Sequence, residues 1–229
     1  MEENQTNTIE KLTFKEKVTY FFKSPSKLFK ATATEKPKIW PLLLFVSLCT
    51  LINALAFSST SKTVRDELIK KGTKGMDIKT AEITKNIMTK IMSPTYHCIS
   101  SLVGVIIGTF FIAFLIFILF KICKTHINYK QTVFICLVSS VATSIGLVFK
   151  AIYMFISKRP VGVEAITNPS VKSALMSSLD IFSIWYYVIL GIGIYTVGKT
   201  SKRKATIITI ILAAITVGFT LLSVKSKMH

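Results

Sequence analysis

The sequence predicts an all-α, polytopic integral membrane protein, with a bundle of five transmembrane helices and an amphipathic N-terminal segment. Residues 99–120 contain no charged side chain and would form a helix of about 33 Å, close to the thickness of the hydrocarbon core of a bilayer. Four further stretches have a similar apolar composition, and 51% of the 229 residues are hydrophobic. The Lys and Arg residues gather beside these stretches, where anionic lipid head groups would meet them.

The N-terminal segment, residues 1–38, is basic and polar at its start. Phe14, Val18, Phe21 and Phe22 recur at helical spacing among lysines, which predicts an amphipathic helix lying on a membrane surface. Packing of the same helix against the membrane-spanning helices is the alternative. The residues of this segment that we expect at the lipid surface are Lys11, Lys15, Lys17 and Lys23.

The remaining chain, residues 39–229, is predicted to form one membrane domain. Its five expected spans are residues 39–57, 96–120, 132–156, 179–197 and 205–224. Residues 58–94, between the first two spans, are polar and show helical periodicity, so we expect an extracytoplasmic helical loop there.

Small and polar residues within the spans predict close packing between helices. Gly104 and Gly108 form a small-xxx-small pair in the second span, and such pairs allow two helix backbones to approach closely. The hydroxyl-rich third span is expected to hydrogen-bond to neighbouring helices or to its own backbone, with a substrate pathway as the alternative. The other residues predicted to pack helices together are Ser139, Ser140, Thr143, Ser144, Gly191 and Gly193.

The short connections at residues 121–130 and 199–204 are strongly basic, which predicts that both face the cytoplasm. This orientation places the N-terminus in the cytoplasm and the C-terminus outside, and we expect the membrane to be the bacterial cytoplasmic membrane. The second connection supplies four further lipid-surface residues: Lys199, Lys202, Arg203 and Lys204.

Two charged residues, Lys150 and Asp180, fall within or at the margin of the predicted spans. An isolated charge in hydrocarbon is costly, so we expect these two side chains to pair. The pair would tie the third span to the fourth. An ion or proton site is the alternative.

No arrangement of residues typical of an enzyme is visible. The chain has no Gly-rich phosphate loop, no HExxH and no G-x-S-x-G motif. Cys123 and His126 have a spacing that suits two metal ligands on a helix, which is too few for a metal site. We therefore expect a non-enzymatic protein without cofactor or metal, and we attribute the net charge of +18 to the membrane surface rather than to nucleic acid.

Three segments resemble the bacterial branch of the Yip family of membrane proteins, which is related to the Ypt/Rab-interacting proteins of eukaryotes. They are YFFKSPSKLFKATATEKPKIWPLLLF (20–45), NYKQTVFICLVSS (128–140) and DIFSIWYYVILGIGIYTVGKTSKRKA (180–205). The resemblance covers most of residues 20–220 outside the first loop. It implies a five-span helical domain with a cytoplasmic N-terminus and no catalytic residues.

Together these observations predict a membrane scaffold, organiser or adaptor that acts through contacts with lipid and protein. Its expected partners are anionic head groups, with a membrane protein or a second copy of the chain as a further partner. The alternative is a small transporter or transport subunit with a polar pathway near Lys150 and Asp180.

Overall fold

The computed structural model describes residues 12–33, 37–122, 127–162, 170–172, 175 and 180–225 of the chain. Within these residues the fold is all helical, as the sequence predicts, and they contain no β-strand. The helices are α1 (Phe14–Lys23), α2 (Pro25–Ala33), α3 (Trp40–Thr60), α4 (Lys62–Thr73), α5 (Ile78–Ile91), α6 (Pro94–Ile122), α7 (Tyr129–Ser157), α10 (Ile181–Val197) and α11 (Lys202–Lys225).

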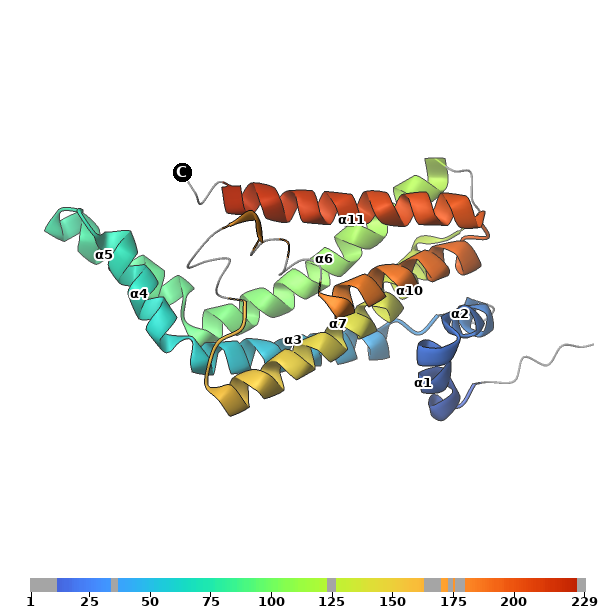
Figure 1. Ribbon diagram of the computed structural model, residues 1–229, viewed down its shortest axis with the longest axis horizontal. Coiled ribbons are helices and arrows are strands. Elements are labelled where there is room, and N and C mark those ends of the chain that lie inside the picture. The colour runs from blue at the N-terminus through green and yellow to red at the C-terminus, as the bar shows by residue number, and fades with distance from the viewer. Residues whose placement is uncertain are drawn as a thin grey trace, which may run out of the picture.

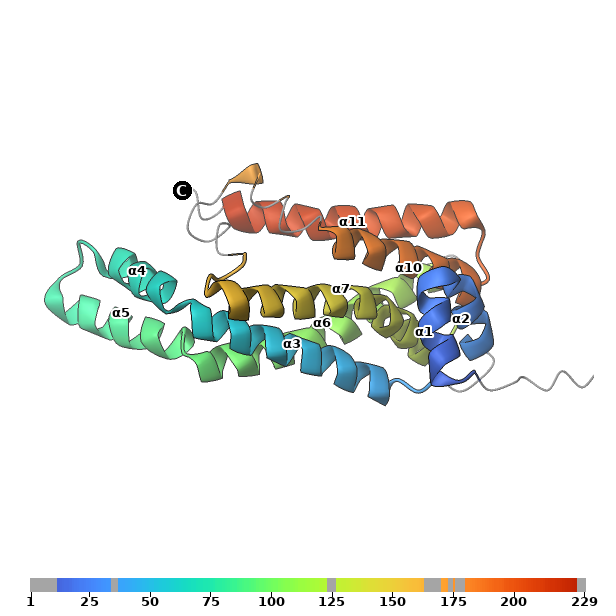
Figure 2. The same cartoon turned by 60° about the horizontal axis from the view of Figure 1, so that its bottom comes forward.

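The long helices run along the length of the molecule, and the short helices lie at its two ends (Figure 1). The α1–α2 pair lies at one end, beside the turn between α10 and α11, and the α4–α5 hairpin projects from the opposite end (Figure 2). Helix α7 is central because it packs against α3, α6 and α10, whereas α11 packs mainly on α10. All side chains from residue 132 to residue 139 of α7 are buried as a consequence.

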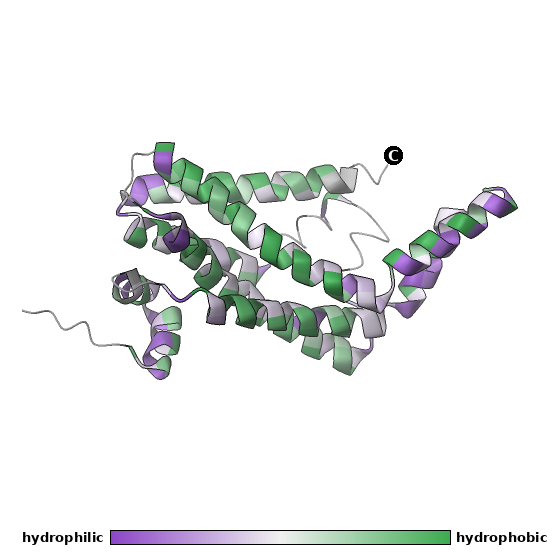
Figure 3. Cartoon of the chain, turned by 180° about the vertical axis from the view of Figure 1, so that it is seen from behind, coloured by the Kyte–Doolittle hydropathy of each residue, from purple (hydrophilic) through white to green (hydrophobic). Residues whose placement is uncertain are grey.

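Four of the described helices are long and apolar enough to cross a membrane: Trp40–Thr60, Pro94–Ile122, Tyr129–Ser157 and Lys202–Leu222. Helix α10 is equally apolar in character but has only 17 residues, so it measures about 25 Å. The predicted count of five spans therefore depends on α10. Figure 3 shows hydrophobic residues along the long helices, and hydrophilic residues on α1 and the α4–α5 hairpin.

Capping side chains extend two helices beyond their apolar cores. Asn128 and Gln131 form a reciprocal capping box at the start of α7, which begins three residues before the predicted span. Thr13 and Glu16 form the same motif at the start of α1. Each box satisfies backbone N–H groups that the first turn of a helix leaves without partners.

The α1–α2 pair is partly embedded in the bundle rather than lying wholly on its surface. Phe21 is buried with its ring centroid 5.1 Å from that of Trp185 on α10, and Phe29 is fully buried against Phe134 of α7. Phe14, on the same apolar stripe as Phe21, is 83% exposed. The packing alternative therefore holds for the Phe21 side of this segment, while contact of the exposed Phe14 side with a membrane surface stays a prediction.

The loop at residues 58–94 folds into the α4–α5 hairpin. Gly75 has φ +82° at the turn, a conformation that glycine adopts without the clash that a Cβ would cause. Arg65 donates from Nη1 to the carbonyl oxygen of Ser58 at 2.8 Å and to Oγ of Ser61 at 3.0 Å. These bonds join the base of the hairpin to the end of α3.

Candidate functional site

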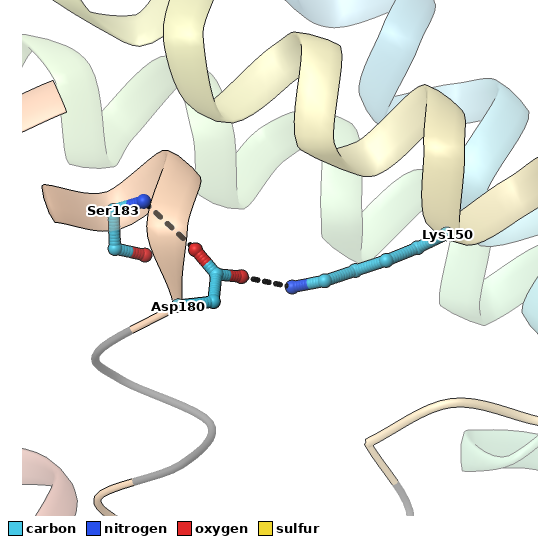
Figure 4. A network of polar contacts seen from close by, with 3 residues as sticks. All are labelled: Lys150, Asp180 and Ser183. Carbon is cyan, nitrogen blue, oxygen red and sulfur yellow. Dashed lines mark hydrogen bonds and ion pairs between the residues drawn. The ribbon is translucent and has the colours of Figure 1, made fainter. Parts of the chain in front are cut away.

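The most polar contact between two long helices joins Lys150 of α7 to Asp180 at the start of α10 (Figure 4). Lys150 Nζ lies 2.5 Å from Asp180 Oδ2, while Asp180 Oδ1 accepts the backbone N–H of Ser183 at 2.8 Å. Asp180 is thus the N-cap of α10, and both of its carboxylate oxygens are engaged. The positive end of the helix dipole and the ammonium group favour the same charged carboxylate.

Aromatic packing fixes the position of this pair. The rings of Phe149 on α7 and Phe182 on α10 stack with centroids 5.8 Å apart and an interplanar angle of 22°. Gly146 of α7 lies so close to Phe182 that an added Cβ would come within 2.7 Å of the ring. These contacts hold the start of α10 against the second half of α7, so the two charged side chains meet.

The Lys150–Asp180 pair is suited to holding helices together. Lys150 lies seven residues before the end of α7 and Asp180 directly precedes α10, so the pair lies toward the ends of the two helices rather than at their centres. The exposed fractions of the two side chains are 38% and 23%. Within the part of the chain that the structure describes, there is no group of three or more His, Cys, Asp or Glu residues that could hold a metal ion. Cys123 and His126 lie outside the described residues.

The predicted packing glycines fall into two groups. A Cβ added at Gly193 would lie 2.6 Å from Ile135 Cγ2, and one added at Gly191 would lie 3.0 Å from Thr209 Oγ1, so both glycines face a neighbouring helix. At Gly104 and Gly108 an added Cβ would meet no atom within 4 Å. The pair on α6 therefore faces open space in this structure.

The hydroxyl groups of α7 bond mainly to their own helix. Ser139 donates to the carbonyl of Ile135, Ser140 to that of Cys136, and Thr143 to that of Ser140, at 2.8, 2.9 and 3.0 Å respectively. The Ser144 hydroxyl is buried without a hydrogen-bond partner. The sequence predicts bonds either to neighbouring helices or to the backbone of the same helix. Three of these four hydroxyl groups bond to the backbone of their own helix.

The basic residues predicted to contact lipid gather at one end of the molecule. Helix α1 and the turn before α11 lie at the same end, away from the α4–α5 hairpin (Figures 1 and 2). Their described basic side chains are all exposed: Lys15, Lys17, Lys23, Lys199, Lys202, Arg203 and Lys204. Lys11 lies outside the described residues. This end therefore presents a concentrated positive surface next to the exposed aromatic side chains of α1.

Two features were not anticipated from the sequence. The ring of Trp185 on α10 contacts both Phe21 and Phe22 of α1, with ring centroids 5.1 Å apart in each pair. A cavity of about 700 Å³ lies between α6, α7, α10 and α11. Neither feature has a local sequence signal, because each depends on how separate helices are placed.

Comparisons with known proteins extend along nearly the whole described chain. The Yip1 domain matches residues 19–224, a range that includes Lys150, Asp180 and the cavity. Membrane protein YknW of Bacillus subtilis (strain 168) is 31% identical over 211 residues, which cover 87% of this chain and 86% of that protein. No solved structure matches the chain.

Proposed function

This chain belongs to the Yip1 domain family and is an integral membrane protein, and we propose that it acts as a non-enzymatic scaffold or adaptor. One observation carries this proposal. The α1–α2 pair is anchored in the bundle by Phe21, Leu28 and Phe29, while its lysines and Phe14 remain exposed. A basic and aromatic surface held rigidly at a membrane boundary suits contact with anionic head groups or with a protein at that membrane.

We propose that the chain crosses the bacterial cytoplasmic membrane five times, with α10 as the short fourth crossing. A helix shorter than the bilayer is accommodated by local thinning of the lipid. The basic turns then face the cytoplasm together with α1 and α2, and the α4–α5 hairpin and C-terminus lie outside.

The partners in this proposal are anionic lipids and a protein, either a membrane protein or a second copy of the chain. The open face of α6 at Gly104 supports a helix partner, because a small residue there permits close approach. The lysines of α1 support the lipid contact, since each basic residue near an anionic surface contributes roughly 1 kcal/mol of attraction.

Co-purification in mild detergent tests the scaffold role. The bound proteins and lipids would be identified for the unchanged chain and for a Lys15→Gln/Lys17→Gln/Lys23→Gln variant. A matched control removes equal charge from the opposite end: Lys74→Gln/Lys79→Gln/Lys85→Gln. We expect the first variant alone to lose its partner. Equal retention in both variants, or equal loss, would contradict the proposal.

The second candidate function is transport through a pathway near Lys150 and Asp180. A charged pair between two apolar helices is the observation that favours it. Both Asp180 oxygens are already occupied within the protein, so we propose instead that the pair is a structural tie.

A further inference from the structure

The cavity of about 700 Å³ lies at the level of the membrane-spanning helices. Its walls include Thr109 and Phe111 of α6, Ser140 of α7, Tyr187 of α10, and Thr216 and Phe219 of α11. All four helices contribute, so the cavity arises from the arrangement of the bundle. Its volume falls within the range of roughly 300–1,000 Å³ typical of ligand pockets.

The cavity lies near the middle of α6, and its length is about half the thickness of the hydrocarbon core of a bilayer. On α6 its lining runs from Val105 to Leu115, which is about 15 Å along the helix axis. The hydrocarbon core of a bilayer is about 30 Å thick, so each leaflet contributes about 15 Å. Both α6 and α11 are among the helices long enough to span that core.

The cavity is open at its side, between α6 and α11. Phe111 and Phe219 contribute to its walls from α6 and α11 and are 58% and 70% exposed. Helix α11 packs mainly on α10 and leaves the space beside α6 unfilled by protein side chains. In a membrane, the surrounding medium at such an opening is hydrocarbon.

The threonine and serine hydroxyl groups that α6, α7 and α11 contribute to the walls offer few donors to a polar ligand. Thr109 donates to the carbonyl of Val105 at 2.7 Å, and Thr216 to that of Leu212 at 2.9 Å. Ser140, Thr143 and Thr220 also donate to carbonyls of their own helices. A polar substrate that entered the cavity would lose its hydrogen bonds to water. These threonine and serine donors could not replace them, because they already donate to backbone carbonyls.

We infer that this cavity is a binding site for one acyl chain of a membrane phospholipid, entering laterally between α6 and α11. An acyl chain has the apolar chemistry and the length along the membrane that the walls require. The site goes beyond the scaffold proposal and does not depend on it, because it involves neither the lysines of α1 nor a protein partner.

Photocrosslinking tests this inference. The full chain would be reconstituted in phosphatidylglycerol and phosphatidylethanolamine vesicles containing phosphatidylglycerol with a diazirine in one acyl chain. Adducts would be mapped by mass spectrometry. We expect labelling of buried wall residues on both α6 and α11, Thr109 and Leu212, in addition to the outward-facing Ile107 and Ile210.

Two neighbouring glycines provide a matched pair of variants. Gly108 lines the cavity and Gly104, one turn away on the same helix, does not, yet an added Cβ meets no atom within 4 Å at either position. Gly108→Phe should abolish wall labelling, while Gly104→Phe should retain it. Thr216→Phe fills the cavity from α11 and should give the same loss, which guards against misfolding of a single variant.

Three results would overturn the inference. Wall labelling that persists in both Gly108→Phe and Thr216→Phe would mean that the lipid does not occupy the cavity. Labelling of the unchanged chain only at outward-facing residues would indicate ordinary surrounding lipid. Crosslinks between two copies of the chain, formed by a photoreactive amino acid placed at position 109 without the lipid probe, would identify a protein helix as the occupant.

Discussion

The ring of Phe29 on α2 lies directly against Gly193 of α10, where an added Cβ would come 2.9 Å from the ring Cζ. A residue just before the first long helix thus fills a gap on a helix that begins about 150 residues later in the chain. The contact requires both residue types, because only glycine leaves room for the aromatic ring. It fixes the basic N-terminal helices to the bundle.

Removing the Phe29 ring should release the N-terminal helices. Phe29 is fully buried, and truncation of a buried Phe to Ala typically costs about 3–5 kcal/mol. The readout is the fluorescence of Trp185, which contacts Phe21 and Phe22, in a Trp40→Phe background. We expect Phe29→Ala to shift the Trp185 emission and lower the melting temperature in detergent.

Phe14→Ala is the control for this experiment, because the Phe14 side chain is 83% exposed. We expect it to change neither the emission nor the melting temperature appreciably. Equal effects of the two substitutions would mean that Phe29 does not anchor the segment.

Removing both charges of the Lys150–Asp180 pair should destabilise the protein by less than the sum of the two single changes. Lys150→Met leaves the Asp180 carboxylate without its partner, and Asp180→Leu leaves the ammonium group without one. We expect each single change to cost about 1–3 kcal/mol, and the double change to cost less than the sum. A double-mutant cycle of unfolding in detergent measures the difference.

The same variants separate the structural role of the pair from transport. If the pair is a tie, the double variant keeps both its expression and the copurifying partner of the unchanged chain. Loss of function in a double variant that remains folded would favour the transport alternative.

The sequence predicted the structure correctly where a local pattern is compatible with only one environment. The charge-free stretch at 99–120 demands an apolar environment, and α6 covers it completely. The amphipathic stripe of α1 is different, because an apolar face fits lipid and protein equally well. Phe21 turns toward Trp185 while Phe14 stays exposed, and this division depends on where α10 lies. Gly104 and Gly193 illustrate the same limit, since only Gly193 has a neighbouring helix.

Acid should loosen the start of α5. Hydrogen bonds from the side chain and backbone N–H of Thr80 lower the pKa of Asp77, the N-cap of this helix. Because the pKa of Asp77 is lower in the folded state, its ionised carboxylate stabilises the helix at pH values above the unfolded pKa of about 3.9. This stabilisation is lost as the pH falls through the pKa of Asp77 in the folded state. We expect faster amide exchange at the start of α5 in acid, after correction for the intrinsic pH dependence of exchange. An Asp77→Asn variant should lack this change, and an identical pH response in that variant would contradict the mechanism.

The proposed topology predicts which positions a membrane-impermeant maleimide can reach in intact cells. In a background with the four native cysteines replaced, Lys79→Cys on the α4–α5 hairpin should be labelled without permeabilisation. Lys202→Cys, at the start of α11, should be labelled only after permeabilisation, because the basic turn before it is expected on the cytoplasmic side. Arg159→Cys, which follows α7, should behave like Lys79→Cys. Helix α10 is the apolar helix described between positions 159 and 202, and opposite labelling of these two sites requires a crossing between them. Identical labelling at both would remove α10 as a span and reduce the crossings to four.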